Sequence, residues 1–469
     1  MDRREDGESF LMVKLEDIVP GLRGKKVLFL GKTKTMSEED IALFLDQLGA
    51  ERAGDEKDEP IALIVMGRLI NPLEEAYSDE KYKEGVPVVD LVELERYYAS
   101  HIDPDALLGS LALFPNRERI IDLLHNGAIG DDLFCEILGF YDWEGQGPFE
   151  TDENRDVAGT LVARFYPEIE KNHNIQYSPV GPFLVAAHSD NAKLLEAMAR
   201  IPDYEITQRS RDAWMPRTLH ESLLINPHLP TSVLERFLVD DDLRRLGFVA
   251  AHPNLPESKQ KELAGRSERR ILEGLARNPN LAADLRERLA QSDDAAVRCA
   301  FLLSQPLDEK TIESVLERRE EAELEALGSN ERLEEAMAIR LVETGIEKLL
   351  EALAANENLS PKVYDALERS KNPSILRALA GNGAASPEML ERLTRVRDKK
   401  VYEALAANPA MPLNHLRNFA KIKDRDIHKA LASNPSTPIE ILLGYQTDGE
   451  LNQILKRNEA FGEYIRQNL

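Results

Sequence analysis

The sequence predicts a small parallel α/β domain followed by an α-helical solenoid, so that the chain combines an α/β part with an all-α part. Within residues 21–100, short apolar runs that read as strands alternate with helical patterns, which is typical of a parallel sheet. From residue 201 to 469 one pattern returns about every 26 residues, and a fixed period of this length indicates stacked helical repeats. Helices of roughly ten residues are unstable alone, so each repeat must pack on its neighbours.

Several repeats close on an Ala-Leu-Ala segment followed by a polar residue, as in Ala404–Asn408. The polar position is occupied by Asn226, His252, Asn278, Ser304, Asn330, Asn356, Asn382, Asn408 and Asn434, with a one-residue slip where Gln305-Pro306 replaces the Asn-Pro step. Asparagine tolerates the left-handed conformation, so we expect Asn408 to end its helix in that conformation and Pro409 to prevent continuation.

In three repeats the first helix is predicted to begin at a hydroxyl residue before proline. Ser386 is the expected N-cap in the repeat that ends at Asn408, with Pro387 at the first helical position. The same cap is predicted at Ser360 and at Thr437, where Glu440 would complete a capping box.

Three positions of the repeat, each followed as a column through successive repeats, indicate which residues pack in the core. Large apolar residues share one position, namely Phe237, Leu263, Leu289, Leu367, Leu393, Phe419 and Tyr445. A second column contains Leu275, Phe301, Leu353, Leu379, Leu405 and Leu431. The third contains the small residues Gly274, Ala300, Ala352, Ala378, Ala404 and Ala430, where we expect helices to approach closely.

The pattern Asn-Pro-x-x-Pro/Ser-x-x-x-Leu-x-x-Leu followed by Ala-Leu-Ala resembles the variant leucine-rich repeats of bacterial proteins, which are related in architecture to HEAT-like repeats. The resemblance covers about half of the chain and implies a fold rather than an activity. Some relatives of that family hold an iron–sulfur cluster on a run of cysteines. Here the only cysteines are Cys135 and Cys299, so no four-thiolate cluster forms within one chain and no cofactor is expected.

The N-terminal part is predicted to begin with a polar leader over residues 1–20, with a short helix around Val13–Ile18. The expected strands and helices follow as Lys25–Gly31, a helix capped by Ser37 and ended by Gly49, Ile61–Gly67, Val86–Asp90 and a closing helix over Leu91–Ala99.

These residues resemble a BRCT domain, most closely the one at the end of bacterial NAD-dependent DNA ligases. The resemblance rests on Gly24–Val27 leading to Leu30-Gly31, Met36–Ile41, Leu48–Ala50, Leu63–Val65 with Gly67, and Lys83–Asp90. Two departures are a second strand that is barely visible near Glu51–Gly54 and the absence of the tryptophan common in the last helix of the family. An unrelated small α/β domain is the alternative.

The resemblance implies an interaction module, and some members of the family bind a phosphorylated peptide. Gly31 with Thr33 or Thr35 matches the first part of that site, and Lys81 or Lys83 matches its lysine. Backbone N–H groups near a helix start together with a cation suit a phosphate. The alternative is a solvated loop.

Residues 101–200 are predicted to form an irregular helical region of divergent repeats that caps the solenoid. Ala186-Ala187-His188 echoes Ala250-Ala251-His252, which places both histidines at the asparagine position of the repeat and favours a turn role over metal binding. No metal site is expected.

The composition excludes several classes of function. The net charge of −25 disfavours general affinity for nucleic acid or anionic membranes. No apolar run is long enough for a signal peptide or a membrane span, and two distant cysteines suit a reducing cytosol, so a cytoplasmic protein is expected. No nucleotide-binding, hydrolase or zinc-protease motif is present, so we do not expect an enzyme. Acidic runs such as Glu320–Glu323 are predicted to be solvated helix faces.

One charge pattern exceeds this background. Residues 369–429 contain 13 Lys/Arg and 6 Asp/Glu, a local charge of +7 that leaves −32 for the rest of the chain. The predicted basic ridge consists of Arg369, Lys371, Arg395, Arg397, Lys399, Lys400, Lys421, Lys423 and Arg425, many of them 26 residues apart. Either the ridge binds a partner, or its cations merely complement the dipole at the end of each first helix. Earlier repeats have Gly265 and Gln291 at the same place, so the dipole alone does not require a cation.

Three functions remain open on the sequence. The first is a non-enzymatic scaffold that binds other proteins through the BRCT-like module and the repeats. The second is a nucleic-acid-binding accessory protein in DNA repair or ligation that uses the ridge, and the third is an enzyme with an unrecognised site. The sequence identifies neither the partner nor the oligomeric state.

Overall fold

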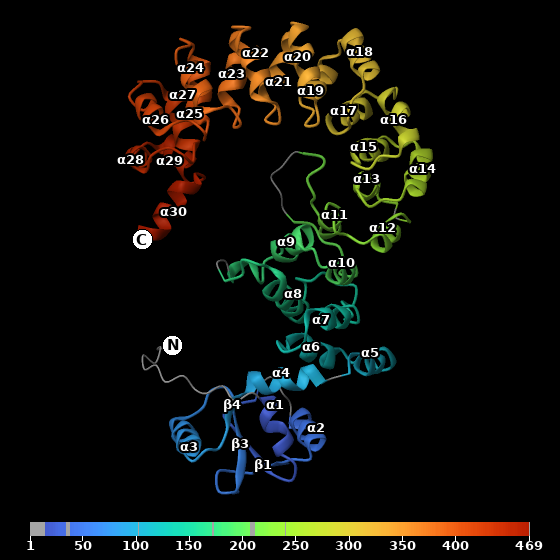
Figure 1. Ribbon diagram of the computed structural model, residues 1–469, viewed down its shortest axis with the longest axis vertical. Coiled ribbons are helices and arrows are strands. Elements are labelled where there is room, and N and C mark those ends of the chain that lie inside the picture. Colours follow the sequence, from blue (N-terminus) through green and yellow to red (C-terminus); the bar gives the residue numbers. More distant parts are fainter. Residues whose placement is uncertain are drawn as a thin grey trace. The chain divides into compact units, whose positions relative to one another are not determined.

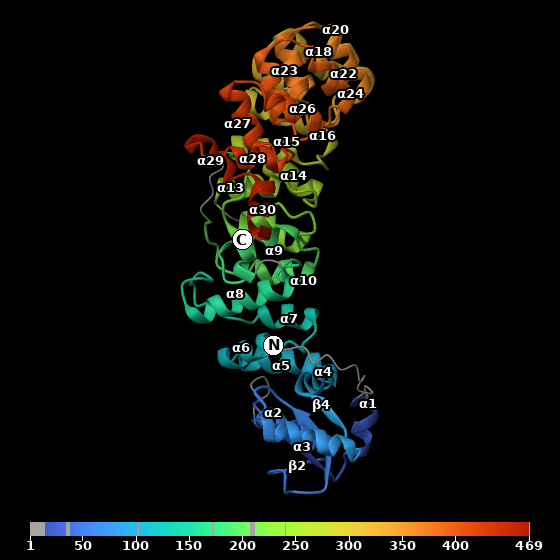
Figure 2. The same ribbon diagram turned by 90° about the vertical axis from the view of Figure 1, so that its left-hand side faces the viewer.

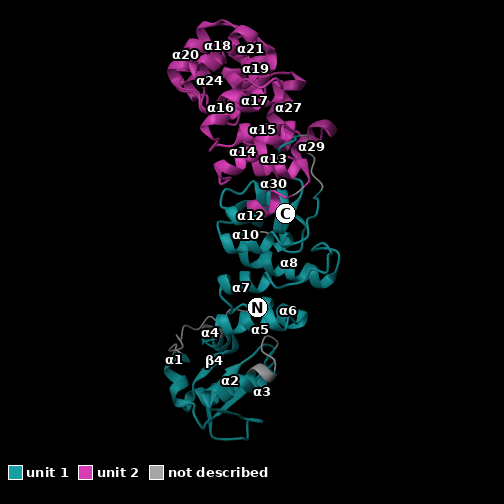
Figure 3. Cartoon of the chain, turned by 90° about the vertical axis from the view of Figure 1, so that its right-hand side faces the viewer, with its two compact units in different colours: residues 1–233 teal, residues 234–469 magenta. Residues whose placement is uncertain are grey.

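A computed structural model describes residues 15–33, 38–101, 103–170, 173–206, 212–239 and 241–468. The chain divides into two compact units, residues 1–233 and residues 234–469 (Figure 3). Most of the predicted leader and the expected cap Ser37 lie outside the described residues.

Unit 1 begins with a four-stranded parallel sheet, as the sequence predicts. The strands are β1 (Lys26–Leu30), β2 (Glu51–Arg52), β3 (Ile61–Met66) and β4 (Val88–Asp90), in the spatial order β2-β1-β3-β4. The strand that the sequence barely indicates is β2, with only two residues. Around the sheet lie α1 (Leu15–Ile18), η1 (Val19–Gly21), α2 (Glu38–Leu48), α3 (Pro72–Lys83) and α4 (Leu91–His101).

Helices cover both faces of the sheet. The two central strands, β1 and β3, place successive apolar side chains on the two faces in turn. Val27 and Leu63 belong to a core cluster with residues of α1, α2 and α4, whereas Leu28 and Ile64 belong to the cluster that includes Tyr77 of α3. Successive side chains of a strand point to opposite faces, so continuous apolar strands need helices on both sides.

The remainder of unit 1 is helical and irregular, as predicted. It contains α5 (Pro104–Leu113), α6 (Arg117–His125), α7 (Asp131–Leu138), α8 (Asp152–Phe165), η2 (His173–Ile175), α9 (Val180–His188), α10 (Ala192–Met198) and α11 (Leu219–Leu224), and α12 (Thr231–Phe237) spans the boundary at residue 233. Neighbours pack in pairs such as α6 with α7, α8 with α9, and α9 with α11.

Unit 2 consists of consecutive helices. They are α13 (Leu243–Ala251), α14 (Glu257–Arg266), α15 (Arg269–Arg277), α16 (Ala283–Ala290), α17 (Ala295–Ser304), α18 (Glu309–Arg318), α19 (Glu321–Gly328), α20 (Glu335–Glu343), α21 (Glu347–Ala355), α22 (Pro361–Glu368), α23 (Pro373–Gly381), α24 (Pro387–Leu393), α25 (Lys399–Ala407), α26 (Leu413–Phe419), α27 (Arg425–Ser433), α28 (Ile439–Gly444), α29 (Gly449–Leu455) and α30 (Glu459–Asn468).

The helices of unit 2 form two rows. Each odd-numbered helix from α13 to α27 contacts the next odd-numbered helix, and Figure 1 shows α13, α15, α17, α19, α21 and α23 along the inner side of an arc with α14, α16, α18, α20 and α22 outside them. A view at right angles shows the same stacking (Figure 2). The structure therefore confirms a helical repeat region, in which an even-numbered helix opens each repeat and an odd-numbered helix closes it.

The two large apolar columns are confirmed as core positions, and the small column is confirmed at Gly274. All residues of the two large apolar columns are buried, from Tyr445 at 9 % exposure to Leu405 at 0 %. In the small column, a Cβ added at Gly274 would lie 2.2 Å from the carbonyl oxygen of Gly247 on the preceding odd-numbered helix, so only glycine fits there. These columns place the core of unit 2 between the two rows of helices.

The predicted left-handed helix end is wrong. Asn408 has φ −75° and ψ 118°, and Asn278, Asn356, Asn382 and Asn434 are extended in the same way. The reason is that the asparagine contributes its side chain rather than an unusual backbone. Its Nδ2 donates to the carbonyls of Ala380 at 2.8 Å and Asn382 at 2.9 Å in the preceding repeat, and its Oδ1 accepts from the N–H of Ala410 at 2.8 Å.

This arrangement repeats as an asparagine ladder. Each rung joins the carbonyls at the end of one odd-numbered helix to the next repeat, and the rungs in unit 2 are Asn278, Gln305, Asn330, Asn356, Asn382, Asn408, Asn434 and Asn458. A helix leaves its last carbonyls without intrahelical partners, and the ladder satisfies them inside the protein.

Two positions of the predicted lattice shift by one residue. Ser304 is the last residue of α17, and Gln305 supplies the rung through Nε2, which donates to the carbonyls of Ala276 and Asn278. In unit 1, Asn226 donates to the carbonyls of Ala186 and Ser189, so Ser189 rather than His188 follows the helix end. The longer side chain of glutamine compensates for the slip at Gln305.

The predicted caps are confirmed only in part. Ser386 accepts the N–H of Met389 as expected, but Ser360 forms no cap hydrogen bond. Thr437 does not cap α28 either, because its buried hydroxyl donates to the carbonyl of Leu431 at the end of α27, and the capping box with Glu440 is therefore wrong.

Candidate functional site

Six cations of the predicted ridge lie in the loops that join the first and second helices of three consecutive repeats. Arg369 and Lys371 lie between α22 and α23, Arg395 and Arg397 between α24 and α25, and Lys421 and Lys423 between α26 and α27. These six residues are called the cation edge below. The loops that carry the asparagine ladder connect the helices at their other ends.

The cation edge is exposed and unpaired. All six side chains belong to exposed residues, and none forms an ion pair with any residue in the ranges that the structure describes. The only side-chain hydrogen bond that these six residues form with a described residue runs from Lys421 Nζ to Asn418 Oδ1 at 3.1 Å. Their positive charge is therefore not compensated locally.

Three further ridge residues have acidic partners. Lys399 Nζ lies 2.8 Å from Asp426 and 3.0 Å from Asp424, and Lys400 pairs with Glu403. Arg425 reaches Asp448 at 3.0 Å and Glu450 at 2.9 Å in the next repeat. The structure thus divides the predicted ridge into six free cations and three that join repeats to each other or stay within one helix.

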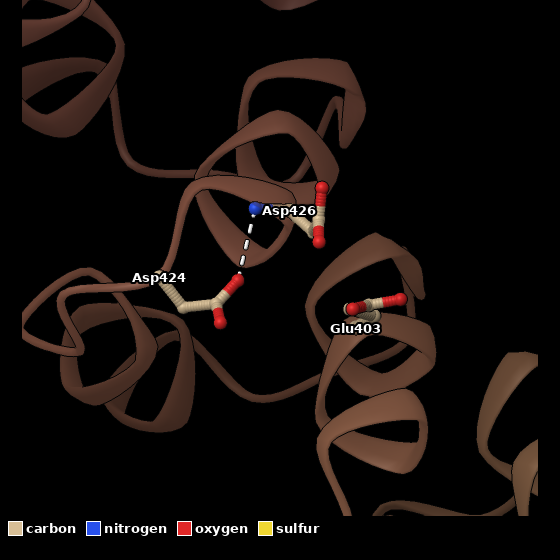
Figure 4. A group of neighbouring side chains, drawn as sticks. All are labelled: Glu403, Asp424 and Asp426. Carbon is tan, nitrogen blue, oxygen red and sulfur yellow. Dashed lines mark hydrogen bonds between the residues drawn. The ribbon is translucent and has the colours of Figure 1, made fainter.

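Glu403, Asp424 and Asp426 form the single group of acidic side chains, among the described residues, that is spaced for a metal ion (Figure 4). The Lys399 ammonium already contacts all three carboxylates, the third of them, Glu403, at 3.7 Å. Hydrogen bonds from Lys399 lower the pKa values of Asp424 and Asp426, and the same bonds raise the pKa of Lys399. We therefore assign the group to an inter-repeat ion pair.

The cation edge is limited to three loops. In the preceding loop the corresponding positions are Glu343 and Gly345, and in the following loop they are Thr447 and Gly449. The loop before the cation edge carries the negative charge of Glu343, and the corresponding residues of the loop after it, Thr447 and Gly449, are uncharged. The free cations therefore form a site of limited length.

Two of the residues predicted for phosphate binding, Gly31 and Lys81, have acidic partners inside the α/β domain. The N–H of Gly31 lies 3.4 Å from the Glu74 carboxylate, which also accepts from Asn71 at the start of α3. Lys81 is held by Glu59 at 2.5 Å and Glu84 at 2.9 Å, and these hydrogen bonds raise its pKa. Thr33 is half-buried and Lys83 is exposed, while Thr35 lies outside the described residues.

One of the acidic runs is not a solvated face. Glu323 is fully buried, where its Oε1 lies 2.5 Å from Arg298 Nε and its Oε2 lies 2.7 Å from Arg318 Nη2. The prediction for Glu320–Glu323 is therefore wrong at this residue. The sequence does not show this burial, because the two arginines lie in neighbouring helices, α17 and α18, and meet Glu323 only in the folded chain.

The cysteine beside a cavity in unit 1 is not a nucleophile at neutral pH. Cys135 borders a cavity of about 390 Å³ together with Lys193 and Arg200. Burial raises the pKa of its thiol to about 12, so the thiol stays protonated. Cys135 is therefore not a candidate for a catalytic nucleophile.

No helix in the described part of the chain has the length and apolar character required to cross a membrane. Scans against protein-family models, curated proteins and solved structures find no match for this chain.

Proposed function

We propose that the protein is a non-catalytic cytoplasmic scaffold whose helical repeats bind an acidic segment of another protein along the cation edge. The observation that carries this proposal is a row of six exposed, unpaired cations on a chain with a net charge of −25. A cluster of cations without ion-pair partners creates a local positive potential that attracts and orients an anionic partner.

The helix dipole explains only half of the cation edge. Arg369, Arg395 and Lys421 lie one or two residues after the end of the first helix of a repeat, where a cation contributes about 0.3–1 kcal/mol. Lys371, Arg397 and Lys423 lie two residues farther on, in the connecting loop. Because the dipole effect falls off within the last turn, it does not account for this second column.

The N-terminal α/β domain is proposed as a second interaction module. Its four parallel strands with helices on both faces support the resemblance to BRCT domains. The acidic partners of Gly31 and Lys81 argue against a preformed phosphate site there, so the proposal does not include one.

Nucleic-acid binding is the alternative, because the same cations also suit phosphates. We favour a protein partner because the site spans only three loops and the remainder of the chain carries −32, which repels a long polyanion that extends beyond the site.

The test is a fluorescence titration of the full chain at low salt with a labelled acidic peptide, a labelled DNA duplex and a labelled single strand. We expect the peptide to bind with micromolar affinity that weakens as salt rises. The variant Arg395→Glu, Arg397→Glu, Lys421→Glu and Lys423→Glu is expected to lose binding.

A matched control reverses four exposed cations elsewhere, Lys25, Lys57, Lys456 and Arg457, and changes the net charge by the same amount. The control is expected to bind nearly as well as the wild type. Absence of peptide binding at micromolar protein, or equal loss in both variants, contradicts the proposal, and preferential binding of either nucleic acid favours the alternative.

A further inference from the structure

Neighbouring loops of the cation edge are separated by one stacking distance. Asn408 Nδ2 lies 2.9 Å from the carbonyl of Asn382 one repeat earlier, and Lys399 Nζ lies 2.8 Å from Asp426 one repeat later. Successive odd-numbered helices are therefore in direct contact, and packed helices lie about 8–10 Å apart. The two cations in each loop of the cation edge therefore recur roughly every 8–10 Å along the repeats.

An extended peptide matches this interval at every third residue. A polyproline II segment rises about 3.1 Å per residue and has three residues per turn, so residues three apart lie on the same side about 9 Å from each other. A carboxylate at every third position would thus meet one loop after another.

An α-helix is a poorer match. Seven helical residues are needed to advance about 10.5 Å, and a helix is about 10–12 Å across. In each loop, the two cations are only two residues apart, as with Arg395 and Arg397, so their Cα atoms are at most about 7 Å apart, which is less than the width of a helix. Isolated short helices are also unstable in water, which adds an ordering cost on binding.

The length of the site sets the length of the ligand. The basic positions begin after Glu343 and Gly345 and end before Thr447 and Gly449, so three loops take part. A segment of about seven extended residues covers two intervals of about 9 Å.

We propose that the cation edge recognises an extended acidic segment of a protein partner that carries a carboxylate at every third residue. This inference rests on the proposed function, because it specifies the partner of the same site. The selectivity arises from the spacing of the loops, in addition to the overall charge.

The experiment compares peptides of equal length and charge that carry three glutamates, and the three non-helical peptides also share one composition. In one peptide the glutamates are at every third residue, in a second at every second residue, in a third side by side, and in a fourth at seven-residue intervals in a helix-forming sequence. Dissociation constants for the full chain are measured by fluorescence anisotropy at low salt.

We expect the peptide with the three-residue interval to bind at least about fivefold more tightly than the others, because each of its charges meets a loop. The variant Arg397→Gln, which empties the middle loop of one cation, is expected to reduce that advantage. Equal affinity of all peptides, or preference for the helical one, overturns the inference but leaves the docking function intact. If no peptide binds, the proposed function fails as well.

Discussion

The two edges of the repeats in unit 2 share one period but differ in burial, charge and internal partners. On the ladder edge, Asn382, Asn408 and Asn434 are at most 2 % exposed, and each uses its amide in three hydrogen bonds. On the cation edge, Arg395 and Lys423 are exposed and form no ion pair with a described residue. Periodicity alone therefore does not tell a structural column from a binding column, whereas burial and partners do.

The contrast leads to opposite expectations for substitutions. Removing a ladder amide leaves buried carbonyls without donors, so stability should fall. Removing a loop cation breaks no ion pair with a described residue, so the stability of the fold should change little while binding should weaken.

The largest effect on stability is expected from a substitution in the core, between the two edges of the repeats. Leu405→Ala removes a fully buried side chain of α25 and should lower the free energy of unfolding by about 2–5 kcal/mol. Urea denaturation followed by circular dichroism measures it. An unchanged midpoint would show that this column does not pack as described.

A ladder substitution should come next. Asn408→Ala leaves the carbonyls of Ala380 and Asn382 and the N–H of Ala410 unpaired, and we expect a loss of about 2–4 kcal/mol. Asn418→Ala is the matched control, because this asparagine is exposed and only accepts from Lys421. Similar unfolding midpoints for the two variants would show that the buried ladder asparagine stabilises the fold no more than the exposed one.

A smaller effect of opposite sign is expected on the cation edge. Lys371 has φ 54°, and the preceding repeat has Gly345 with φ 67° at the corresponding position. Lys371→Gly relieves the left-handed strain, so stability should stay within about 1 kcal/mol of the wild type or rise slightly. Acidic-peptide affinity should nevertheless fall, and a marked drop in thermal stability would show that this cation is structural.

The smallest effect concerns the Lys399 ion pair and its dependence on pH. Lys399 depresses the pKa values of Asp424 and Asp426 below 3.8, so the pair contributes stability above that pH and loses it as the pH falls through the depressed values. The difference in midpoint between wild type and Lys399→Met should therefore be present at pH 6 and shrink below about pH 4. A difference that does not change with pH would contradict this assignment.

Much of the fold was predictable because it depends on local pattern. The strands follow apolar runs such as Ile61–Met66, and the repeat columns follow the 26-residue period. The ladder was not predictable, since the hydrogen bonds of Asn408 involve residues 26 and 28 positions earlier. The buried state of Glu323 was missed for a related reason, because Arg298 lies 25 positions earlier and meets this carboxylate only in the folded chain.

The candidate site was predictable in its outline but not in its composition. Charge and spacing identified the nine ridge residues, yet they did not distinguish Arg397, which is free, from Lys399, which contacts three carboxylates. That distinction depends on where Asp424 and Asp426 lie in the next repeat. Charge counting along a sequence does not contain this information.

The most direct test of the account measures stability and binding on one variant, Arg395→Glu, Arg397→Glu, Lys421→Glu and Lys423→Glu. We predict a free energy of unfolding within about 0.5 kcal/mol of the wild type per substitution, as for exposed positions, together with loss of acidic-peptide binding. An unfolded variant, or a folded variant that binds the acidic peptide as tightly as the wild type, would contradict the claim that the cation edge is free for a partner.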